Sequence, residues 1–398
     1  MFRPLRTASL TLEHRIVMAP LTRCRCPSSV PTPLMAEHYG QRATRGGLLI
    51  SEATDVAETG RGYPDTPGAF SAEQAAGWRV VSDRVHRAGG VFFVQLWHAG
   101  RASLRSLQPD GQLPVGPSSI PFAGQATDPV SLALQGCPVN RALSLAEVRR
   151  VPGAFARSAR LVVEDGGADG VELHCCYGTS LLDQFLKSSS NRRDDAYGGS
   201  RANRARLLLE TVDAVADAVG PHRVGVRLSP FSQAMDCYEE EPATGGPEGR
   251  GGGSGGVAEG GGRGAAWELC EFVLGELAKR RLAYVHVISS SRSTLTAALR
   301  ELCPGGTLLV CGGYTPASAA QVVSSGVADL VAFGTAFVGN PDLVERVRLG
   351  APLRETDPDD FYPRPSARED LARGYVDQPT LEDRAREELE AQLRWPRG

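Results

Sequence analysis

Several polar side chains follow short apolar runs in this 398-residue chain, at points where barrel and sheet enzymes collect their chemistry. Gln95 offers a donor and an acceptor on one amide, and Arg227 offers a fixed positive charge. His174 adds a group that binds a substrate oxygen or moves a proton. The run ends show no carboxylate pair, no Cys-His or Ser-His-Asp arrangement and no metal-ligand spacing. The set suits a planar, hydrogen-bonding cofactor and predicts no metal site.

Eight apolar or β-branched runs must position these residues. Gly, Pro or polar turns bound each run, and helix-length segments separate them. Continuous apolar strands that alternate with helices are typical of a parallel sheet buried on both faces, so eight runs predict an α/β fold, a parallel (β/α)8 TIM barrel. An open parallel sheet fits the same runs. The runs are Ile16 to Ala19, Leu48 to Ile50, Val91 to Leu96, Gly170 to Leu173, Val224 to Leu228, Ala283 to Ile288, Thr307 to Cys311 and Leu330 to Phe333.

Two segments interrupt the alternation of strands and helices. Residues 103–140 are rich in Pro, Gly and Ser and lack either periodicity, which predicts an excursion after the third strand on the catalytic face. Residues 239–264 are dominated by Gly and Glu, a composition that cannot bury enough apolar area to offset the entropy of ordering. We expect a disordered insertion there, within a single domain that spans residues 1–398.

Charge and cysteine usage restrict the partners. A net charge of -3 at pH 7 leaves no basic patch for nucleic acid and no polybasic segment for a membrane surface, so a small-molecule partner is expected. Nine cysteines without a C-x-x-C pair indicate scattered thiols in a reducing compartment rather than a disulfide framework. The N-terminus has no signal-peptide pattern and no segment is long and apolar enough to span a bilayer, so a cytoplasmic location is expected.

Three motifs carry a resemblance to a known family. They are Ala19 to Arg23, Gln95 to His98, and Val171 to His174 followed by the polar segment Arg193 to Ser200. Together they resemble the old yellow enzyme family of flavin oxidoreductases over nearly the whole chain. The resemblance implies an FMN-binding barrel that takes electrons from NADH or NADPH and reduces the C=C bond of an α,β-unsaturated carbonyl compound, in the manner of plant oxophytodienoate reductases. It would act as a monomer or homodimer.

The resemblance assigns the ring of the flavin to specific side chains. Gln95 would bind the pyrimidine edge, Arg227 the N1 and C2 carbonyl side, and Thr22 the region of the C4 carbonyl and N5. Without a cofactor, Gln95 and Arg227 would instead be partners in an internal polar network of the barrel. Backbone groups would complete the cradle at Pro20, Leu21 and Ala53.

The phosphate of the flavin is expected at the seventh and eighth strand ends, where Gly312, Gly313 and Gly334 stand. The family usually has an arginine directly after the last of these glycines, and Thr335 replaces it here. The loss of one charge-assisted hydrogen bond is worth roughly 1.5–3 kcal/mol, or about 10- to 100-fold in affinity. We therefore expect FMN to bind more loosely.

The catalytic loop departs from the family pattern. Family members place a histidine, then His or Asn three residues later, then a tyrosine two residues beyond. The segment that starts at His174 is one residue longer than this pattern. Counting forward from His174 puts Tyr177 at the second ligand position and Thr179 at the proton donor.

Counting backward from Asp183 instead puts Gly178 and Ser180 at these positions, and neither register restores both groups. By resemblance, His174 would hydrogen-bond the substrate carbonyl oxygen. We expect Tyr177 to take the donor role, unless water substitutes for it; without a donor, general acid catalysis worth about 10²–10⁴-fold is lost.

Two aromatic residues, Trp97 and Tyr375, match positions that shape the family's substrate pocket, although aromatic side chains more often belong to a core. Two other functions compete with an alkene reductase. One is a flavin-binding relative with impaired or no turnover. The other is a non-flavin barrel such as an aldolase, which needs a lysine or carboxylate at a strand end, and none stands at the eight ends.

Overall fold

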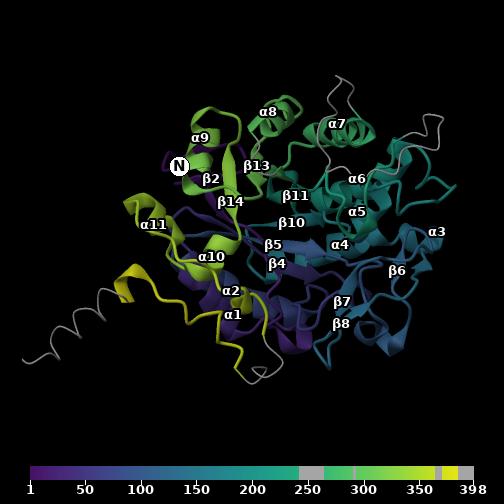
Figure 1. The fold of residues 1–398 in the computed structure, drawn as a ribbon, viewed down its shortest axis with the longest axis horizontal. Helices are drawn as coiled ribbons and strands as arrows, with labels where there is room; N and C mark the ends of the chain where they lie inside the picture. Colours follow the sequence, from purple (N-terminus) through teal and green to yellow (C-terminus); the bar gives the residue numbers. More distant parts are fainter. Residues whose placement is uncertain (242–263, 290–292, 364–369, 384–398) are drawn as a thin grey trace, which may run out of the picture.

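A closed barrel of eight parallel strands forms the centre of the protein in the computed structural model, which describes residues 1–241, 264–289, 293–363 and 370–383 (Figure 1). All eight predicted runs are strands of this barrel, and the TIM barrel prediction is confirmed. Pairing of β5 with β10 and of β14 with β3 closes the sheet, which excludes the open alternative. The strands are β3 (Ile16–Met18), β4 (Leu48–Asp55), β5 (Val91–Trp97), β10 (Gly170–Cys175), β11 (Val224–Leu228), β12 (Tyr284–Ile288), β13 (Leu308–Cys311) and β14 (Leu330–Phe333).

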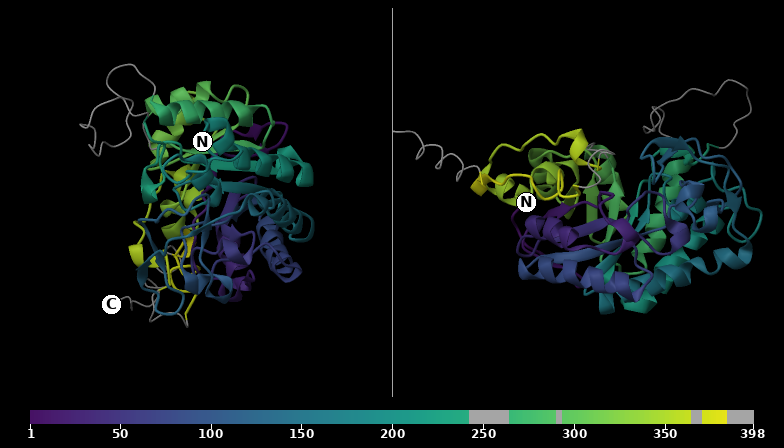
Figure 2. Two further views of the ribbon diagram at one scale, coloured as in Figure 1. Left: turned by 90° about the vertical axis from the view of Figure 1, so that its right-hand side faces the viewer. Right: turned by 90° about the horizontal axis from the view of Figure 1, so that it is seen from below.

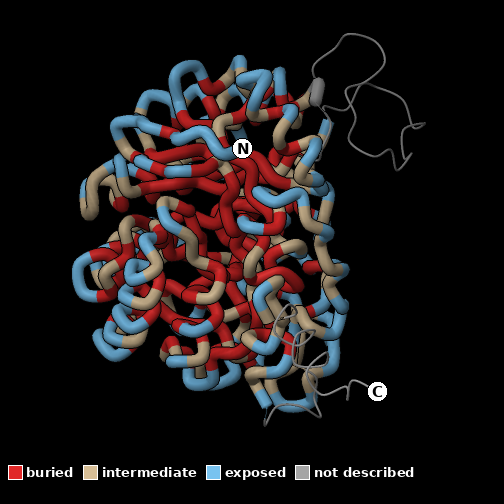
Figure 3. The backbone as a smooth tube through the Cα atoms, turned by 90° about the vertical axis from the view of Figure 1, so that its left-hand side faces the viewer, coloured by how far each residue is buried: buried red, intermediate tan, exposed pale blue. Residues whose placement is uncertain are grey.

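Helices surround the strands, as two further views show (Figure 2). None of the helices in the described ranges is long and apolar enough to cross a membrane. Figure 3 shows the buried backbone concentrated in the barrel, with exposed segments on the outside. The longer helices are α1 (Pro33–Arg42), α2 (Ala72–Arg87), α4 (Val151–Arg160), α6 (Arg201–Val219), α7 (Ala265–Ala278), α8 (Ser293–Glu301) and α9 (Pro316–Ser324), and shorter ones are α3 (Leu145–Val148), α5 (Leu181–Leu186), α10 (Thr335–Gly339) and α11 (Leu343–Leu349).

Strand β4 is longer than the predicted run and irregular. Its pairing with β5 shifts register between Ile50 and Ala53, which is the signature of a β-bulge. Beyond the shift, Ala53 lies directly opposite Gln95. The bulge therefore aligns the C-terminal end of β4 with the polar end of β5.

Residues 103–140 lie between β5 and α3 and contain only short elements. Strand β6 (Val115–Gly116) pairs with β9 (Arg141–Ala142), while β7 (Gln125–Thr127) and β8 (Leu134–Gly136) form an antiparallel pair. These strands extend from the C-terminal end of β5, so the excursion starts at the face where the strand-end residues gather.

Most of the expected disordered insertion, residues 242–263, lies outside the described residues. The residues that flank these, 239–241 and 264, are within the described structure. The Glu241 carboxylate accepts a hydrogen bond from the backbone N–H of Ala265, 3.0 Å away, at the start of α7. Glu239 pairs with Arg204. Fixed acceptors thus anchor both ends of the insertion, which composition alone does not indicate.

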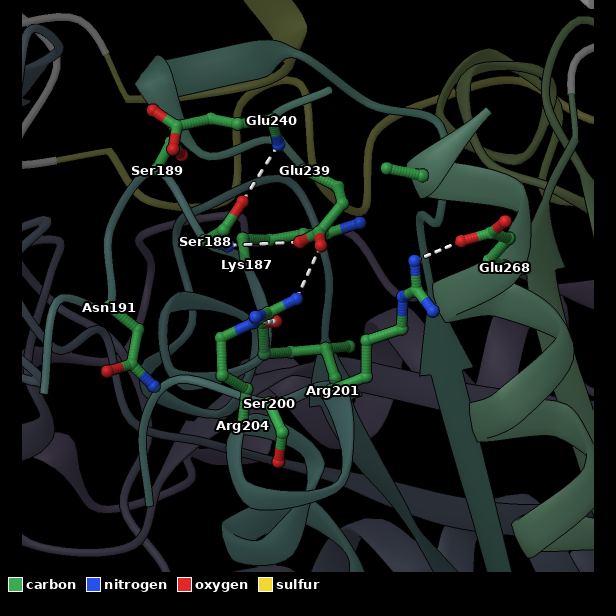
Figure 4. A network of polar contacts seen from close by, with 12 residues as sticks. Lys187, Ser188, Ser189, Asn191, Ser200, Arg201, Arg204, Glu239, Glu240 and Glu268 are labelled. Carbon is green, nitrogen blue, oxygen red and sulfur yellow. Dashed lines mark hydrogen bonds and ion pairs between the residues drawn. The ribbon is translucent and has the colours of Figure 1, made fainter. Parts of the chain in front are cut away.

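Two arginines of α6 form ion pairs with glutamates of other segments (Figure 4). Arg204 donates to the carbonyl of Leu186, 3.1 Å away, at the end of α5, and forms an ion pair with Glu239. The Arg204 and Glu239 side chains are only 8% and 5% exposed. Arg201, one turn earlier, pairs with Glu268 of α7 at the surface. Arg204 therefore ties the C-terminal end of α5 to the start of α6 and to Glu239.

Replacing Arg204 with methionine tests this anchor. The change leaves the buried Glu239 carboxylate without its charge partner, so we expect a loss of about 3–5 kcal/mol in the free energy of unfolding. Equilibrium urea unfolding measures it. The matched control is Arg201→Met, which removes an exposed pair and should cost less than about 1 kcal/mol. Equal losses in the two variants would show that Arg204 is no special anchor.

Candidate active site

The strand ends bring the predicted polar residues into one cluster. Gln95 on β5 lies opposite Glu172 on β10. Two residues further along β10, on the same face, His174 lies opposite Arg227 of β11, which in turn lies opposite His286 of β12. All five side chains are buried. The structure therefore places Gln95, His174 and Arg227 together at the C-terminal end of the barrel.

A buried carboxylate that the sequence reasoning missed organises this cluster. Glu172 accepts a hydrogen bond from Gln95 Nε2 at 2.7 Å and another from His286 Nδ1 at 2.9 Å. Burial would raise the pKa of Glu172, but His286, the charge of Arg227 and the Gln95 hydrogen bond together outweigh burial and lower it. Burial opposes charge on His286 as well, yet Glu172 raises its pKa. Glu172 and His286 therefore form a buried ion pair. The sequence does contain one sign of this site, because Glu172 is a carboxylate within an apolar strand, two residues before His174.

Arg227 provides a test of whether a flavin fits this cluster. Its Nη2 donates to Cys311 Sγ at 3.6 Å, while its buried Nε has no hydrogen-bond partner within the described residues. Burial opposes the charge, but Cys311 and Cys176 raise the pKa of Arg227, so it remains a cation. A buried donor without an acceptor costs about 1–3 kcal/mol. A carbonyl of a planar cofactor would supply the missing acceptor, so these residues fit a flavin ring.

The Gln95 amide has one N–H and its carbonyl oxygen left to bind a ligand. One N–H is bound to Glu172, and in the described structure the carbonyl oxygen forms no hydrogen bond. The remaining N–H and this oxygen form the donor and acceptor pair that a pyrimidine edge requires. The internal polar network considered for Gln95 therefore exists, with Glu172 as its partner rather than Arg227.

His174 is a neutral imidazole packed beside Trp97. Burial, reinforced by the positive charge of Arg227, lowers the pKa of His174 to about 3. The Cys176 sulfur lies 3.5 Å from His174 Nε2, and the Trp97 ring centre lies 6.0 Å from that of His174. Trp97 in turn donates from Nε1 to the carbonyl of Thr179 at 2.7 Å. Trp97 thus fixes both the histidine and the loop that follows it.

The loop geometry separates the hydroxyl groups that could donate a proton. Ser180 is buried and its hydroxyl donates to the backbone carbonyl of His174. Tyr177 is 38% exposed, and the Arg227 guanidinium lies 6.0 Å from the centre of its ring. Its backbone N–H donates to Ser229 Oγ at 2.7 Å. Ser180 is therefore engaged in holding the loop, while Tyr177 offers its phenol beside Arg227.

Tyr177 adopts an uncommon backbone conformation. Its φ of 59° lies in the left-handed region, which costs energy for a residue with a side chain. The following N–H, that of Gly178, donates to the Asp183 carboxylate at 2.8 Å. Hydrogen bonds of the Tyr177 and Gly178 N–H groups therefore hold Tyr177 in this conformation.

The expected phosphate end consists of turns rather than charged side chains. Gly312 and Gly313 have φ values of 118° and 74°, a region that favours glycine. Helix α10 begins at Thr335 after Gly334, and no side chain caps it, so its first N–H groups remain available to an anion. The side chain of Leu21 lies against Gly334, where an added Cβ would meet it at 3.3 Å. The ends of β3 and β14 thus meet at this turn.

The pocket expectation for Tyr375 is not supported by its surroundings. The residue is fully buried, its ring stacks on His38 with centres 3.9 Å apart, and the guanidinium groups of Arg23 and Arg25 each lie 5.0 Å from it. A side chain with no exposed surface packs the core. Trp97 instead neighbours Tyr63, 5.9 Å away between ring centres.

Tyr63 belongs to an aromatic group that the sequence reasoning missed. Its ring stacks on that of Tyr362 with centres 6.5 Å apart and planes 9° from parallel. Tyr362 is half exposed, so this group presents an aromatic surface beside Trp97. No local pattern marks it, because the two tyrosines lie about three hundred residues apart.

Comparison with known proteins decides the family. Residues 1–354 match the model of the NADH:flavin oxidoreductase / NADH oxidase family. The chain belongs to this family, that of the old yellow enzymes. It is 40% identical to 12-oxophytodienoate reductase 1 of Oryza sativa subsp. japonica, over 96% of this chain and 93% of that protein. It is 37% identical to 12-oxophytodienoate reductase 2 of Arabidopsis thaliana, over 96% of each.

Solved structures agree with this assignment. Morphinone reductase has a TM-score of 0.84 and 38% identity with this old yellow enzyme, over 96% of each chain. Morphinone reductase in complex with tetrahydroNAD has a TM-score of 0.83 and 39% identity, over 96% of this chain and 97% of the other. The protein is an FMN-dependent NAD(P)H oxidoreductase that reduces the C=C bond of α,β-unsaturated carbonyl compounds. These relatives do not favour a flavin-binding protein without turnover.

Replacing Glu172 with glutamine tests the buried ion pair. Without the carboxylate, burial opposes the charge on His286 and only Cys311 still raises its pKa, so the pKa of His286 should fall. Titration of the imidazole resonances by NMR in both proteins measures the change. The control is Glu210→Gln, which removes a carboxylate bonded to the Tyr197 hydroxyl and should leave His286 unchanged. An unchanged His286 pKa in the Glu172→Gln variant would contradict the ion pair between Glu172 and His286.

Restoring the family's arginine tests the phosphate end. Thr335→Arg should tighten FMN binding by about 10- to 100-fold, because one charge-assisted hydrogen bond to phosphate is gained. Quenching of FMN fluorescence on binding gives the dissociation constant. Thr11→Arg adds the same charge at an exposed position of β2 (Thr11–Leu12) and should have no such effect. Equal tightening in both variants would indicate a general charge effect.

Proposed function

We propose that His174 and Tyr177 carry out the chemistry of alkene reduction in this enzyme. Bound FMN supplies the chemistry of hydride transfer from NAD(P)H to the β-carbon of the alkene. His174, neutral because of its low pKa, donates a hydrogen bond to the carbonyl oxygen of the substrate and polarises the double bond. The observation that supports this role is its position beside Arg227 at the end of a barrel strand.

Tyr177 is proposed as the general acid. Burial raises the pKa of its phenol above the ordinary value of 10.0, so the hydroxyl keeps its proton in neutral solution and can release it only to a strong base such as a forming carbanion. Its exposed position beside Arg227 supports this role, whereas Ser180 is bound to backbone. Thr179 and water are the competing donors.

The flavin is proposed to lie across the strand ends. Arg227 and Gln95 would hold its pyrimidine side, and Thr22 the side of N5. The buried Nε of Arg227, which has no hydrogen-bond partner within the described residues, supports this position of the flavin. The residues proposed for the remaining cradle and the phosphate are Pro20, Leu21, Ala53, Gly312, Gly313, Gly334 and Thr335.

The substrate is proposed to be a small enone held against Trp97, Tyr63 and Tyr362. Reductases named for 12-oxophytodienoate and morphinone among the relatives support a substrate of this kind. A cytoplasmic location, absence of nucleic-acid partners and a monomeric or homodimeric state are further proposals. The nine free cysteines support a reducing compartment.

Tyr177→Phe tests the general acid. With FMN bound and reduced by NADPH under anaerobic conditions, we expect reoxidation by 2-cyclohexenone to slow by about 10²–10⁴-fold, since the proton donor is lost. Reduction by NADPH should keep its rate, because that step requires no proton from the phenol. Stopped-flow absorbance of the flavin follows both steps.

The control is Tyr238→Phe, which removes a hydroxyl from a similarly exposed tyrosine outside the strand-end cluster. Reoxidation should proceed normally in this variant. Normal reoxidation in Tyr177→Phe would rule out Tyr177 as the donor and leave Thr179 or water.

A further inference from the structure

Cys311 lies in the strand-end cluster but has no role in the alkene reduction proposed above. It is the last residue of β13 and directly precedes the Gly312-Gly313 turn. Its side chain is 5% exposed, and its sulfur lies 3.6 Å from Arg227 Nη2. The thiol therefore stands between the arginine proposed for the flavin ring and the turn proposed for the phosphate.

The groups around Cys311 come from three neighbouring strands and one loop. Arg227 of β11 and His286 of β12 are cationic, and Glu172 of β10 is anionic. Cys176 and Tyr177, in the loop after β10, also interact electrostatically with Cys311. Burial alone would raise the pKa of Cys311, but the positive charges of His286 and Arg227 outweigh burial and hold it at about 7.

The other eight cysteines behave differently. Burial raises the pKa of each, for example to about 11 at Cys303. Cys311 is therefore the one thiol of the nine whose surroundings favour the thiolate. Geometry explains the difference, because only Cys311 has an arginine nitrogen within hydrogen-bond distance of its sulfur.

We infer that Cys311 is a positioning residue that tunes the flavin: its thiolate takes up a proton when the flavin is reduced, and the resulting thiol releases that proton when the flavin is reoxidised. The inference rests on the proposed placement of the flavin beside Arg227. It adds to that placement a group that competes with the reduced flavin for the same positive charge.

The charge balance gives the direction. Arg227 and His286 contribute two positive charges and Glu172 one negative, so the cluster carries one positive charge when Cys311 is a thiol and none when it is a thiolate. Hydride from NAD(P)H brings two electrons and one proton to the flavin and leaves it an anion. That anion and the thiolate repel each other in a buried site, so the thiolate is expected to take a second proton from water.

The cycle balances without another reactant. When the flavin passes the hydride to the alkene, it returns to its neutral oxidised form. The Cys311 thiol then releases its proton to water. The sulfur is neither oxidised nor reduced, and no covalent bond forms at it.

Midpoint potential against pH tests this coupling on the FMN-loaded enzyme. Each proton taken up with two electrons changes the equilibrium constant tenfold per pH unit, which is about 30 mV. Above about pH 7 the wild-type enzyme should approach a hundredfold change per pH unit, about 60 mV, because two protons accompany the electrons. Cys311→Ala should show the one-proton slope of about 30 mV. Spectroelectrochemical titration from pH 6 to 9 gives these slopes.

Two further variants complete the experiment. Cys311→Ser keeps a small polar side chain without a thiolate, so it should match the alanine variant and replaces it if alanine impairs folding. Cys303→Ala removes a buried thiol that lies before β13, away from Arg227, and should keep the wild-type slope. Equal slopes in the wild type and both Cys311 variants would overturn the inference.

The variant Arg227→Met distinguishes a failure of the Cys311 proposal from a failure of the proposed flavin position beside Arg227. Lower FMN affinity and a lower midpoint potential in Arg227→Met, together with unchanged slopes in the Cys311 variants, would overturn the role of Cys311 alone. If Arg227→Met changes neither quantity, the flavin does not lie beside Arg227, and both proposals fall.

Discussion

The active end of this barrel depends on one buried ion pair, between Glu172 and His286. Both side chains are completely buried, so each charge must be compensated within the protein. Glu172 then uses its second oxygen to bind Gln95 at 2.7 Å, which fixes the amide that remains for a ligand. Because the three residues stand on β5, β10 and β12, the pair also ties together strands that are not all adjacent.

The catalytic loop shows how a one-residue change in length is accommodated. Ser180 and Asp183 bind backbone groups at the two ends of the loop, so α5 starts in a fixed position. Within this loop Tyr177 lies in the left-handed region, and its ring lies beside Arg227. Because the loop is held at both ends, the position of this aromatic side chain is restricted as well.

The sequence predicted the barrel because its strands are continuous apolar runs, and it placed Gln95, His174 and Arg227 correctly because parallel strands end on one face. It missed Glu172, whose partner His286 lies more than a hundred residues away. It also did not indicate that Tyr375 is fully buried, since the arginines and the histidine around that ring come from the opposite end of the chain. Contacts between distant segments are not visible in local patterns, and these contacts decided both cases.

The balance of charge explains why this site suits a flavin that becomes negative. When Cys311 is a thiol, two cations, Arg227 and His286, face one carboxylate inside the barrel, and one positive charge is in excess. An excess positive charge in a buried site is unfavourable on its own, since few solvent dipoles reach it. An arriving anion removes that penalty and is itself stabilised more strongly than it would be in water. A neutral ligand gains no such stabilisation, so charges fixed on three strands would favour a reduced cofactor in this site once Cys311 is protonated.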